Sequence, residues 1–208
     1  ACADAFGVDL AGGDTTRGPL TLSVTIAGEV PAGAAITRGG ARAGDELWIS
    51  GQPGRAALGL AALRGEAELD APQRTEFVDA LLRPQPRVAL GLALRGLASA
   101  MLDVSDGLLG DLRHILECSA AGAIVETAAL PLAALTASGA DAALCRRCLL
   151  AGGDDYELLF AAPPRHRSEI ESLSARFGLA LHRIGHLTAE RSVLLLREAD
   201  GGLAAPPA

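Results

Sequence analysis

The chain has 208 residues and a net charge of -7, and half of its residues are apolar. This length fits one domain of ordinary size, or one domain with a piece of another. Binding nucleic acid without regard to sequence needs a basic face, and no cluster of Lys and Arg supplies one, so we expect no nucleic-acid partner. No apolar run reaches the length of about 18 residues that suggests a membrane span, and no signal peptide is visible. We therefore expect a cytoplasmic protein without a membrane partner.

The first 40 residues predict short elements and turns. Residues 1–14 are typical of the end of a helix, a short strand and a glycine turn. Apolar residues alternate with Thr and Ser over residues 20–26, and this period of two predicts a strand with one buried face. Residues 28–42 are rich in glycine and predict a connector. We therefore place a domain boundary there, with residues 1–40 on one side and residues 41–208 on the other.

The remainder of the chain predicts strands and helices in irregular order. The expected strands cover residues 45–50, 123–126, 156–161, 181–185 and 192–197. The expected helices follow the turn at residues 51–54, cover residues 73–82, begin near Arg87 and run into residues 97–100, follow Ser105, and cover residues 167–177. This order favours an α+β domain with helices packed on one sheet.

The helix after Ser105 has the clearest pattern. Its apolar residues recur on one face, as expected for an amphipathic helix. They are Leu108, Leu109, Leu112, Ile115 and Leu116. We expect Ser105 to cap the helix and Asp106 to lie in its first turn, where a negative charge complements the helix dipole.

The first motif with chemistry is GGDTTRGP, residues 12–19. Paired glycines allow the backbone to approach a ligand closely, and their amides can point at phosphate oxygens. Asp14 offers a hard oxygen ligand for Mg²⁺, and Arg17 offers a guanidinium for a phosphate. The alternative is a plain turn in which Asp14 is solvated.

The second motif is DVSDG, residues 103–107. It places two carboxylates three positions apart, with a hydroxyl between them, at the start of the helix. Because Asp103 follows an apolar stretch, we expect it to be buried, where an unpaired carboxylate would be costly without a cation. Alternatively, Ser105 is only a cap and Asp106 only a charge at a helix end, which would leave Asp103 unexplained.

The third motif is GGDDYE, residues 152–157. Adjacent Asp154 and Asp155 would repel one another unless a cation or a cationic group of a ligand lay nearby. A solvated loop is the alternative. The turn at residues 51–54 also precedes a helix, whose N-terminus could hold a phosphate.

Together, in this order and spacing, these motifs resemble the thiamine-monophosphate kinase family. The family belongs to an ATP-binding superfamily that includes aminoimidazole ribonucleotide synthetase and selenophosphate synthetase. Segments that carry the resemblance are GGDTTRGPL, GEVPAGAAITRGGARAGDELWISG, LRPQPRVALG, LDVSDGLLGDLRHI and GGDDYELLF. The resemblance implies the C-terminal domain of the aminoimidazole ribonucleotide synthetase-like fold, a mixed sheet with helices packed on it. Residues 1–40 would then hold the last strands of a truncated N-terminal α/β domain that binds ATP and Mg²⁺.

The resemblance also implies an activity and roles for single residues. ATP would phosphorylate thiamine monophosphate directly to thiamine diphosphate, the final step of thiamine diphosphate biosynthesis, with several Mg²⁺ ions and no protein nucleophile. The implied ATP contacts are Gly13, Asp14, Arg38 and Ser105, the implied Mg²⁺ ligands are Asp14, Asp103 and Asp106, and the implied substrate contact is Asp154. The resemblance further implies a homodimer for the full-length protein.

The chain departs from the family pattern in three places. The family has Glu where this chain has Asp154, most of the N-terminal domain has no counterpart, and no aromatic ending follows Gly202. The chain also opens at Ala1 and its only methionine is Met101, so we expect a truncated portion with little kinase activity alone. Two alternatives remain open: another enzyme of the superfamily, or a non-catalytic binding or dimerisation module that retains the fold.

Overall fold

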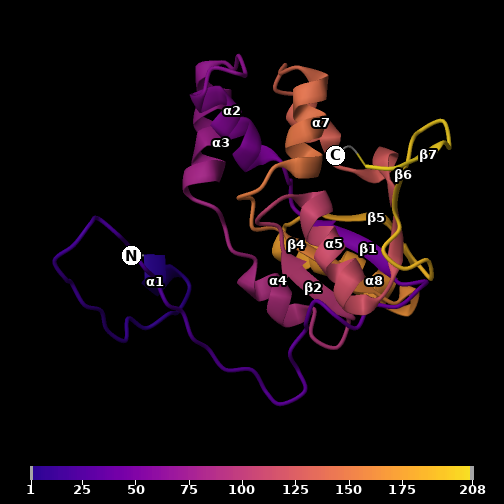
Figure 1. Cartoon of the computed structure of the whole chain (residues 1–208), viewed down its shortest axis with the longest axis horizontal. Coiled ribbons are helices and arrows are strands. Elements are labelled where there is room, and N and C mark those ends of the chain that lie inside the picture. The colour runs from indigo at the N-terminus through magenta and orange to yellow at the C-terminus, as the bar shows by residue number, and fades with distance from the viewer. Residues whose placement is uncertain (1, 207–208) are drawn as a thin grey trace. The chain divides into compact units, whose positions relative to one another are not determined.

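The computed structural model describes residues 2–206 of the chain, which divide into two compact units. The first unit ends at Ala35 and the second begins at Ile36. Figure 1 labels the elements of both units. Among the described residues, no helix is long and apolar enough to span a membrane.

In the first unit, the short helix α1 (Cys2–Ala5) is the one regular element of its described residues. The strand predicted for residues 20–26 is wrong, as is the short strand predicted within residues 1–14, because neither segment is assigned as a strand. The side chains of Leu20 and Val24 are 95% and 94% exposed. Alternation alone does not make a strand, because the backbone N–H and C=O groups also need a pairing partner.

The second unit is built on one mixed sheet of seven strands, counted over the described residues. Its order is β2-β4-β1-β5-β3-β6-β7. The strands are β1 (Glu46–Ser50), β2 (Ala100–Asp103), β3 (Gly122–Glu126), β4 (Leu158–Ala162), β5 (Leu181–Thr188), β6 (Leu194–Arg197) and β7 (Leu203–Ala204). Strands β3 and β6 pair in parallel, and the other neighbours pair antiparallel.

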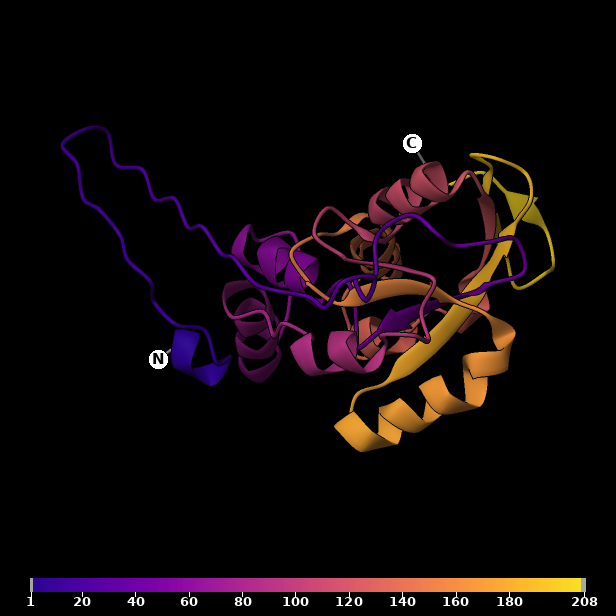
Figure 2. The same ribbon diagram turned by 90° about the horizontal axis from the view of Figure 1, so that it is seen from below.

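Helices cover both faces of this sheet, which confirms the predicted α+β fold. They are α2 (Arg55–Leu63), α3 (Ala71–Leu82), α4 (Val88–Ala93), α5 (Leu108–Ser119), α6 (Leu132–Thr136), α7 (Ala142–Ala151) and α8 (Arg167–Phe177), with short 3₁₀ turns at Thr127–Ala129 and Pro164–His166. Figure 2 shows α8 and α5 on opposite sides of the long strand β5.

The central strand β1 explains why the sheet has two cores. Its residues are all buried, and successive side chains of a strand point to opposite faces. Leu47 and Ile49 belong to the larger core, which includes the apolar face of α5. Trp48 belongs to the smaller core, where it stacks on Phe160 with ring centroids 6.3 Å apart and packs with residues of α4 and α8.

Two local predictions in this unit are wrong. The helix expected from Arg87 into residues 97–100 ends at Ala93, because Gly96 adopts a positive φ of 80° and Ala100 begins strand β2. In addition, Ser105 does not cap α5, since Gly107 holds that position and Asp106 precedes the first turn. The predicted apolar face of α5 is confirmed, as all five of its residues are buried.

Candidate functional site

Two acidic loops lie side by side where strands β2 and β4 meet. We call residues 103–107 the first acidic loop and residues 152–157 the second. Asp103 at the end of β2 pairs with Leu158 at the start of β4, so both loops leave the sheet at the same end. Backbone hydrogen bonds continue the pairing into the loops. The N–H of Val104 donates to Glu157 O (2.8 Å), that of Tyr156 to Val104 O (2.9 Å) and that of Asp154 to Ser105 O (3.0 Å).

Glycines make this close contact possible. A Cβ atom on Gly153 would lie 2.1 Å from the carbonyl oxygen of Ser105, far inside van der Waals contact. A Cβ atom on Gly107 would lie 2.8 Å from the carbonyl oxygen of Ala151, and the φ of Gly107 is 119°. The glycines of both motifs are therefore required for the two loops to dock, whatever they bind.

The second acidic loop holds two non-glycine residues in the left-handed region. The φ of Asp154 is 65° and that of Tyr156 is 53°. This conformation is costly for L-residues and uncommon for a bulky one. Residues with such φ values cluster at functional sites, where the surrounding structure holds them. The hydrogen bonds to Val104 and Ser105 provide that restraint here.

Three carboxylates act on the hydroxyl of Tyr156. The hydroxyl donates to Asp154 Oδ1 at 3.4 Å. The pKa of Tyr156 is raised by partial burial, by the charge and hydrogen bond of Asp154, and by the charges of Asp103 and Asp106. Carboxylates from both loops therefore contribute to one negative region, and carboxylate oxygens are the hard ligands that Mg²⁺ prefers. The chemical type of these donors fits a divalent cation.

The expectation that Asp103 is buried is wrong. Asp103 is exposed, so burial does not by itself demand a cation to neutralise it. It lies at the end of an edge strand, where its side chain reaches solvent although the neighbouring Leu102 is buried. The case for a cation is therefore the combined negative charge that Asp103, Asp106 and Asp154 exert on Tyr156.

Sequence reasoning missed Asp111, which organises the first acidic loop. Its side chain is 4% exposed, and its Oδ2 atom accepts the N–H groups of Ser105 (3.0 Å), Asp106 (3.0 Å) and Gly107 (3.1 Å). Ligand atoms of Asp106, Asp111 and His114 also lie within 4.8 Å of one another. The available signal was a carboxylate in the first helical turn, close enough in sequence to accept the N–H groups just before the helix.

Asp155 of the second loop binds the N-terminus of α2. Its carboxylate accepts the N–H groups of Gly54 (2.5 Å) and Ala56 (3.0 Å), so these groups, which we had considered for a phosphate, bind a protein side chain instead. Burial raises the pKa of Asp155 from 3.8 to about 6. The hydrogen bonds from the helix terminus oppose this rise, and the charge of Glu157 adds to it.

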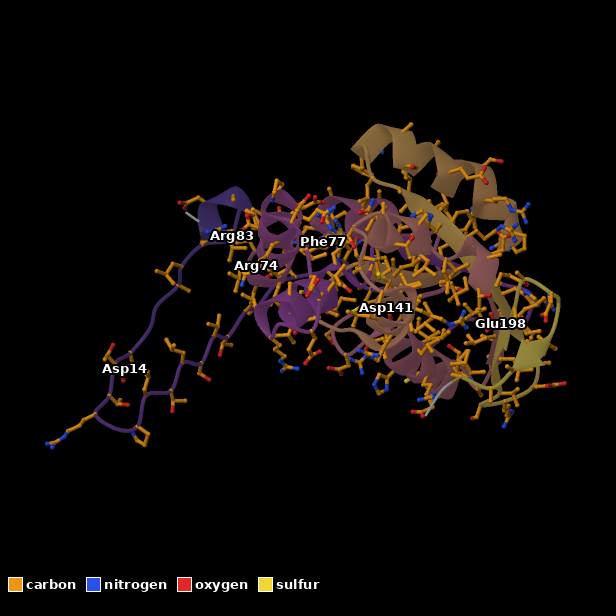
Figure 3. All side chains as sticks on the ribbon, turned by 90° about the horizontal axis from the view of Figure 1, so that it is seen from above. Asp14, Arg74, Phe77, Arg83, Asp141 and Glu198 are labelled. Atoms are coloured by element: carbon orange, nitrogen blue, oxygen red, sulfur yellow. The ribbon has the colours of Figure 1, made fainter. Side chains whose placement is uncertain are left out.

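Glu157 of the second loop forms a buried ion pair with Arg87. Arg87 Nε donates to Oε2 at 2.8 Å and Nη2 donates to Oε1 at 2.5 Å, while Ser50 Oγ donates to Oε2 at 2.5 Å. This hydrogen bonding raises the pKa of Arg87. The pair borders a cleft of about 390 Å³ between α2, α3 and the start of α4. Arg83, which directly follows α3, also lines this cleft and is labelled in Figure 3.

Three further residues with predicted roles lie outside the acidic loops. Gly13 and Asp14 belong to the first unit, where Asp14 Oδ1 accepts the N–H of Thr15 at 2.7 Å. Figure 3 labels Asp14 on the loop of that unit. Arg38 belongs to the second unit and is exposed, and its carbonyl oxygen accepts the hydroxyl of Ser119 at 3.4 Å. The ligand-binding roles of these three residues stay predictions.

The sequence matches one family model, described as "AIR synthase related protein, C-terminal domain", over residues 42–196. Thiamine-monophosphate kinase of Escherichia coli K12 is 40% identical over 186 residues, which cover 89% of this chain and 57% of the relative. The enzyme of the same name from Haemophilus influenzae is 41% identical over 167 residues, covering 80% and 51%. The predicted resemblance is thus confirmed, and the chain spans about half the length of these relatives.

Solved structures give the same relationship. Thiamine-monophosphate kinase from Stenotrophomonas maltophilia K279a has a TM-score of 0.71 and 39% identity, covering 84% of this chain and 56% of that one. A structure described as "AaThiL complexed with AMPPCP and TMP" has a TM-score of 0.63 and 28% identity, covering 82% and 52%. HypE of Escherichia coli has a TM-score of 0.67 at 20% identity, which shows a shared fold alone.

Proposed function

Because this chain belongs to the family of the AIR synthase related protein C-terminal domain, we propose that its two acidic loops form part of the active site of a thiamine-monophosphate kinase. The reaction is ATP-dependent phosphorylation of thiamine monophosphate to thiamine diphosphate. The observation that carries the proposal is the docking of the two acidic loops, after which the charges of Asp103, Asp106 and Asp154 all act on one tyrosine hydroxyl. Relatives of that name at about 40% identity support it, as does the relative solved with AMPPCP and TMP.

The acidic loops suit phosphoryl transfer because this reaction depends on positioning and charge neutralisation rather than on a protein nucleophile. Asp103 and Asp106 would hold Mg²⁺, which neutralises phosphate oxygens when it is bound. The hydroxyl of Ser105, between these two carboxylates in sequence, would donate to a phosphate oxygen of ATP. Asp154 would contact the substrate, whose thiazolium ring carries a positive charge.

The further calls are part of the same proposal. Gly13, Asp14 and Arg38 are proposed ATP contacts, and Asp14 is also a proposed Mg²⁺ ligand. We also propose that the full-length protein is a homodimer in the cytoplasm, without nucleic-acid or membrane partners. The resemblance and the composition support these calls.

The direct test is turnover by the full-length protein that contains these residues. We expect thiamine diphosphate to form from thiamine monophosphate, ATP and Mg²⁺. Asp103→Asn removes one charged ligand and should lower turnover by at least about a hundredfold, because one well-placed charged group contributes about that much. The matched control is Asp200→Asn, since Asp200 is exposed in the turn before β7, at the opposite edge of the sheet from the acidic loops. Normal turnover by Asp103→Asn, or no thiamine diphosphate from the unaltered protein, would contradict the proposal.

A further inference from the structure

We infer that Asp111 is a positioning residue for the cation-binding carboxylates of the first acidic loop. The inference rests on the proposed function only in taking Asp103 and Asp106 as the groups that bind the cation. Asp111 lies one turn into α5, and its buried carboxylate binds the backbone of the loop.

The hydrogen bonds of Asp111 account for the shape of the loop. A single oxygen, Oδ2, accepts three consecutive N–H groups, those of residues 105–107, at 3.0 to 3.1 Å. Three donors converge on one atom only when the backbone curls around it. The N–H of Asp111 in turn donates to Gly107 O at 2.8 Å, which ties the loop to the first turn of the helix.

The charge of Asp111 makes this arrangement strong. Hydrogen bonds to an ionised acceptor contribute about twice as much as neutral ones. The carboxylate also lies near the positive end of the α5 dipole, which stabilises it. No basic side chain makes an ion pair with Asp111 among residues 2–206, so the three N–H groups and the helix terminus are what compensate its burial.

The arrangement also determines what the first acidic loop can offer a ligand. Because the N–H groups of residues 105–107 donate to Asp111, they are not available to bind phosphate oxygens. A phosphate at this loop must therefore be held by side chains or through a cation. Residues between Asp103 and Asp106 follow the curl that Asp111 sets, so the separation of these two carboxylates depends on Asp111.

The test is Asp111→Asn in the full-length protein, with Asp141→Asn as the matched control. Asp141 has the same kind of role elsewhere, since its Oδ1 accepts the N–H of Leu144 at the start of α7. Two readouts are independent of turnover: amide hydrogen exchange of residues 105–107, and Mn²⁺ affinity measured by electron paramagnetic resonance.

We expect Asp111→Asn to accelerate exchange of the three amides and to weaken Mn²⁺ binding about tenfold, the lower end of what is lost with groups that orient metal ligands. Asp141→Asn should change neither quantity. Faster exchange with unchanged Mn²⁺ affinity would overturn the inference, because Asp111 would then support the loop without affecting the cation. Unchanged exchange would overturn it as well.

Asp111→Glu keeps the inference testable if the Asn variant fails to fold. It retains the charge but displaces it by one methylene, so we expect Mn²⁺ affinity between that of the unaltered protein and that of a tenfold loss. An affinity equal to that of the unaltered protein, with faster exchange of residues 105–107, would overturn the inference. A protein whose Mn²⁺ affinity depends on Asp111 as described, but which forms no thiamine diphosphate, would contradict the proposed function and leave this inference standing.

Discussion

Replacing Gly153 by alanine should separate the two acidic loops. The new Cβ atom would lie 2.1 Å from the carbonyl oxygen of Ser105, whereas ordinary contact begins near 3.4 Å. The backbones must therefore move apart by more than an ångström at a point where they are joined by the Asp154–Ser105 and Tyr156–Val104 hydrogen bonds. Overpacking costs about 1–3 kcal/mol and each lost hydrogen bond about 1 kcal/mol. We expect a loss of about 3 kcal/mol.

Urea unfolding of Gly153→Ala measures this loss, and Gly110→Ala is the matched control. A Cβ atom on Gly110 would meet nothing within 4 Å, and the residue lies inside α5. Alanine should therefore stabilise the helix by about 0.5–1 kcal/mol. Opposite signs for two identical substitutions are the predicted result. If Gly153→Ala were as stable as the unaltered protein, the close docking of the loops would be refuted.

Three more changes test other parts of the structure. Because folding raises the pKa of Asp155 to about 6, protonation of this carboxyl stabilises the folded state. This stabilisation is complete below about pH 4 and is lost as the pH rises through 6. The Asp155→Asn variant has no carboxyl to titrate at this position. Its free energy of unfolding, relative to that of the unaltered protein, should therefore rise by up to about 3 kcal/mol from pH 4 to pH 7. A difference that does not change with pH would contradict the raised pKa of Asp155. Arg87→Met leaves the buried Glu157 unpaired and should lower the free energy of unfolding in urea by about 3 kcal/mol. Arg83→Met, the control, removes an exposed pair and should lower it by less than about 1 kcal/mol. Equal losses would argue against the buried pair. Leu112→Ala empties a fully buried position of α5 and should cost about 2–5 kcal/mol by thermal or urea unfolding, and a neutral result would contradict the packing of that helix.

Elements with strong local signals could be predicted from the sequence. The apolar face of α5 follows a helical period, and the strand at residues 45–50 is flanked by turns, so both were found close to their observed bounds. Helix α3 was predicted two residues short, because the cap formed by Asp70 and Gln73 lies before the apolar pattern begins. In these segments, local preference and tertiary packing agree.

Elements that depend on distant partners could not be predicted in the same way. Strand β2 has only four residues, and it forms because β4, more than fifty residues later, pairs with it. Residues 20–26 show the reverse case, since they have the pattern of a strand without a partner among the described residues. Sequence periodicity reports which side chains can be buried together, and it says little about which backbones meet.

The candidate site shows the same limit. Its acidic residues were recognisable from their motifs, but the contact between the two acidic loops arises from the pairing of β2 with β4. The role of Asp111 was also hidden, because Ser105 has the residue type of a cap, whereas in the structure Gly107 holds the cap position and Asp111 accepts the N–H of Ser105. The expected burial of Asp103, from which we inferred a cation, is wrong for a related reason. The exposure of a residue at a strand end depends on the neighbours of that strand.

The most direct test of the account is a Mn²⁺ titration followed by amide nuclear magnetic resonance. If the two acidic loops form one cation site, amide signals of residues 103–107 and 152–157 should broaden together at the same Mn²⁺ concentration. Signals near Asp200, an exposed acidic residue in the turn before β7, at the opposite edge of the sheet from β2, should stay sharp. Broadening of one loop without the other, or of neither, would contradict a shared site.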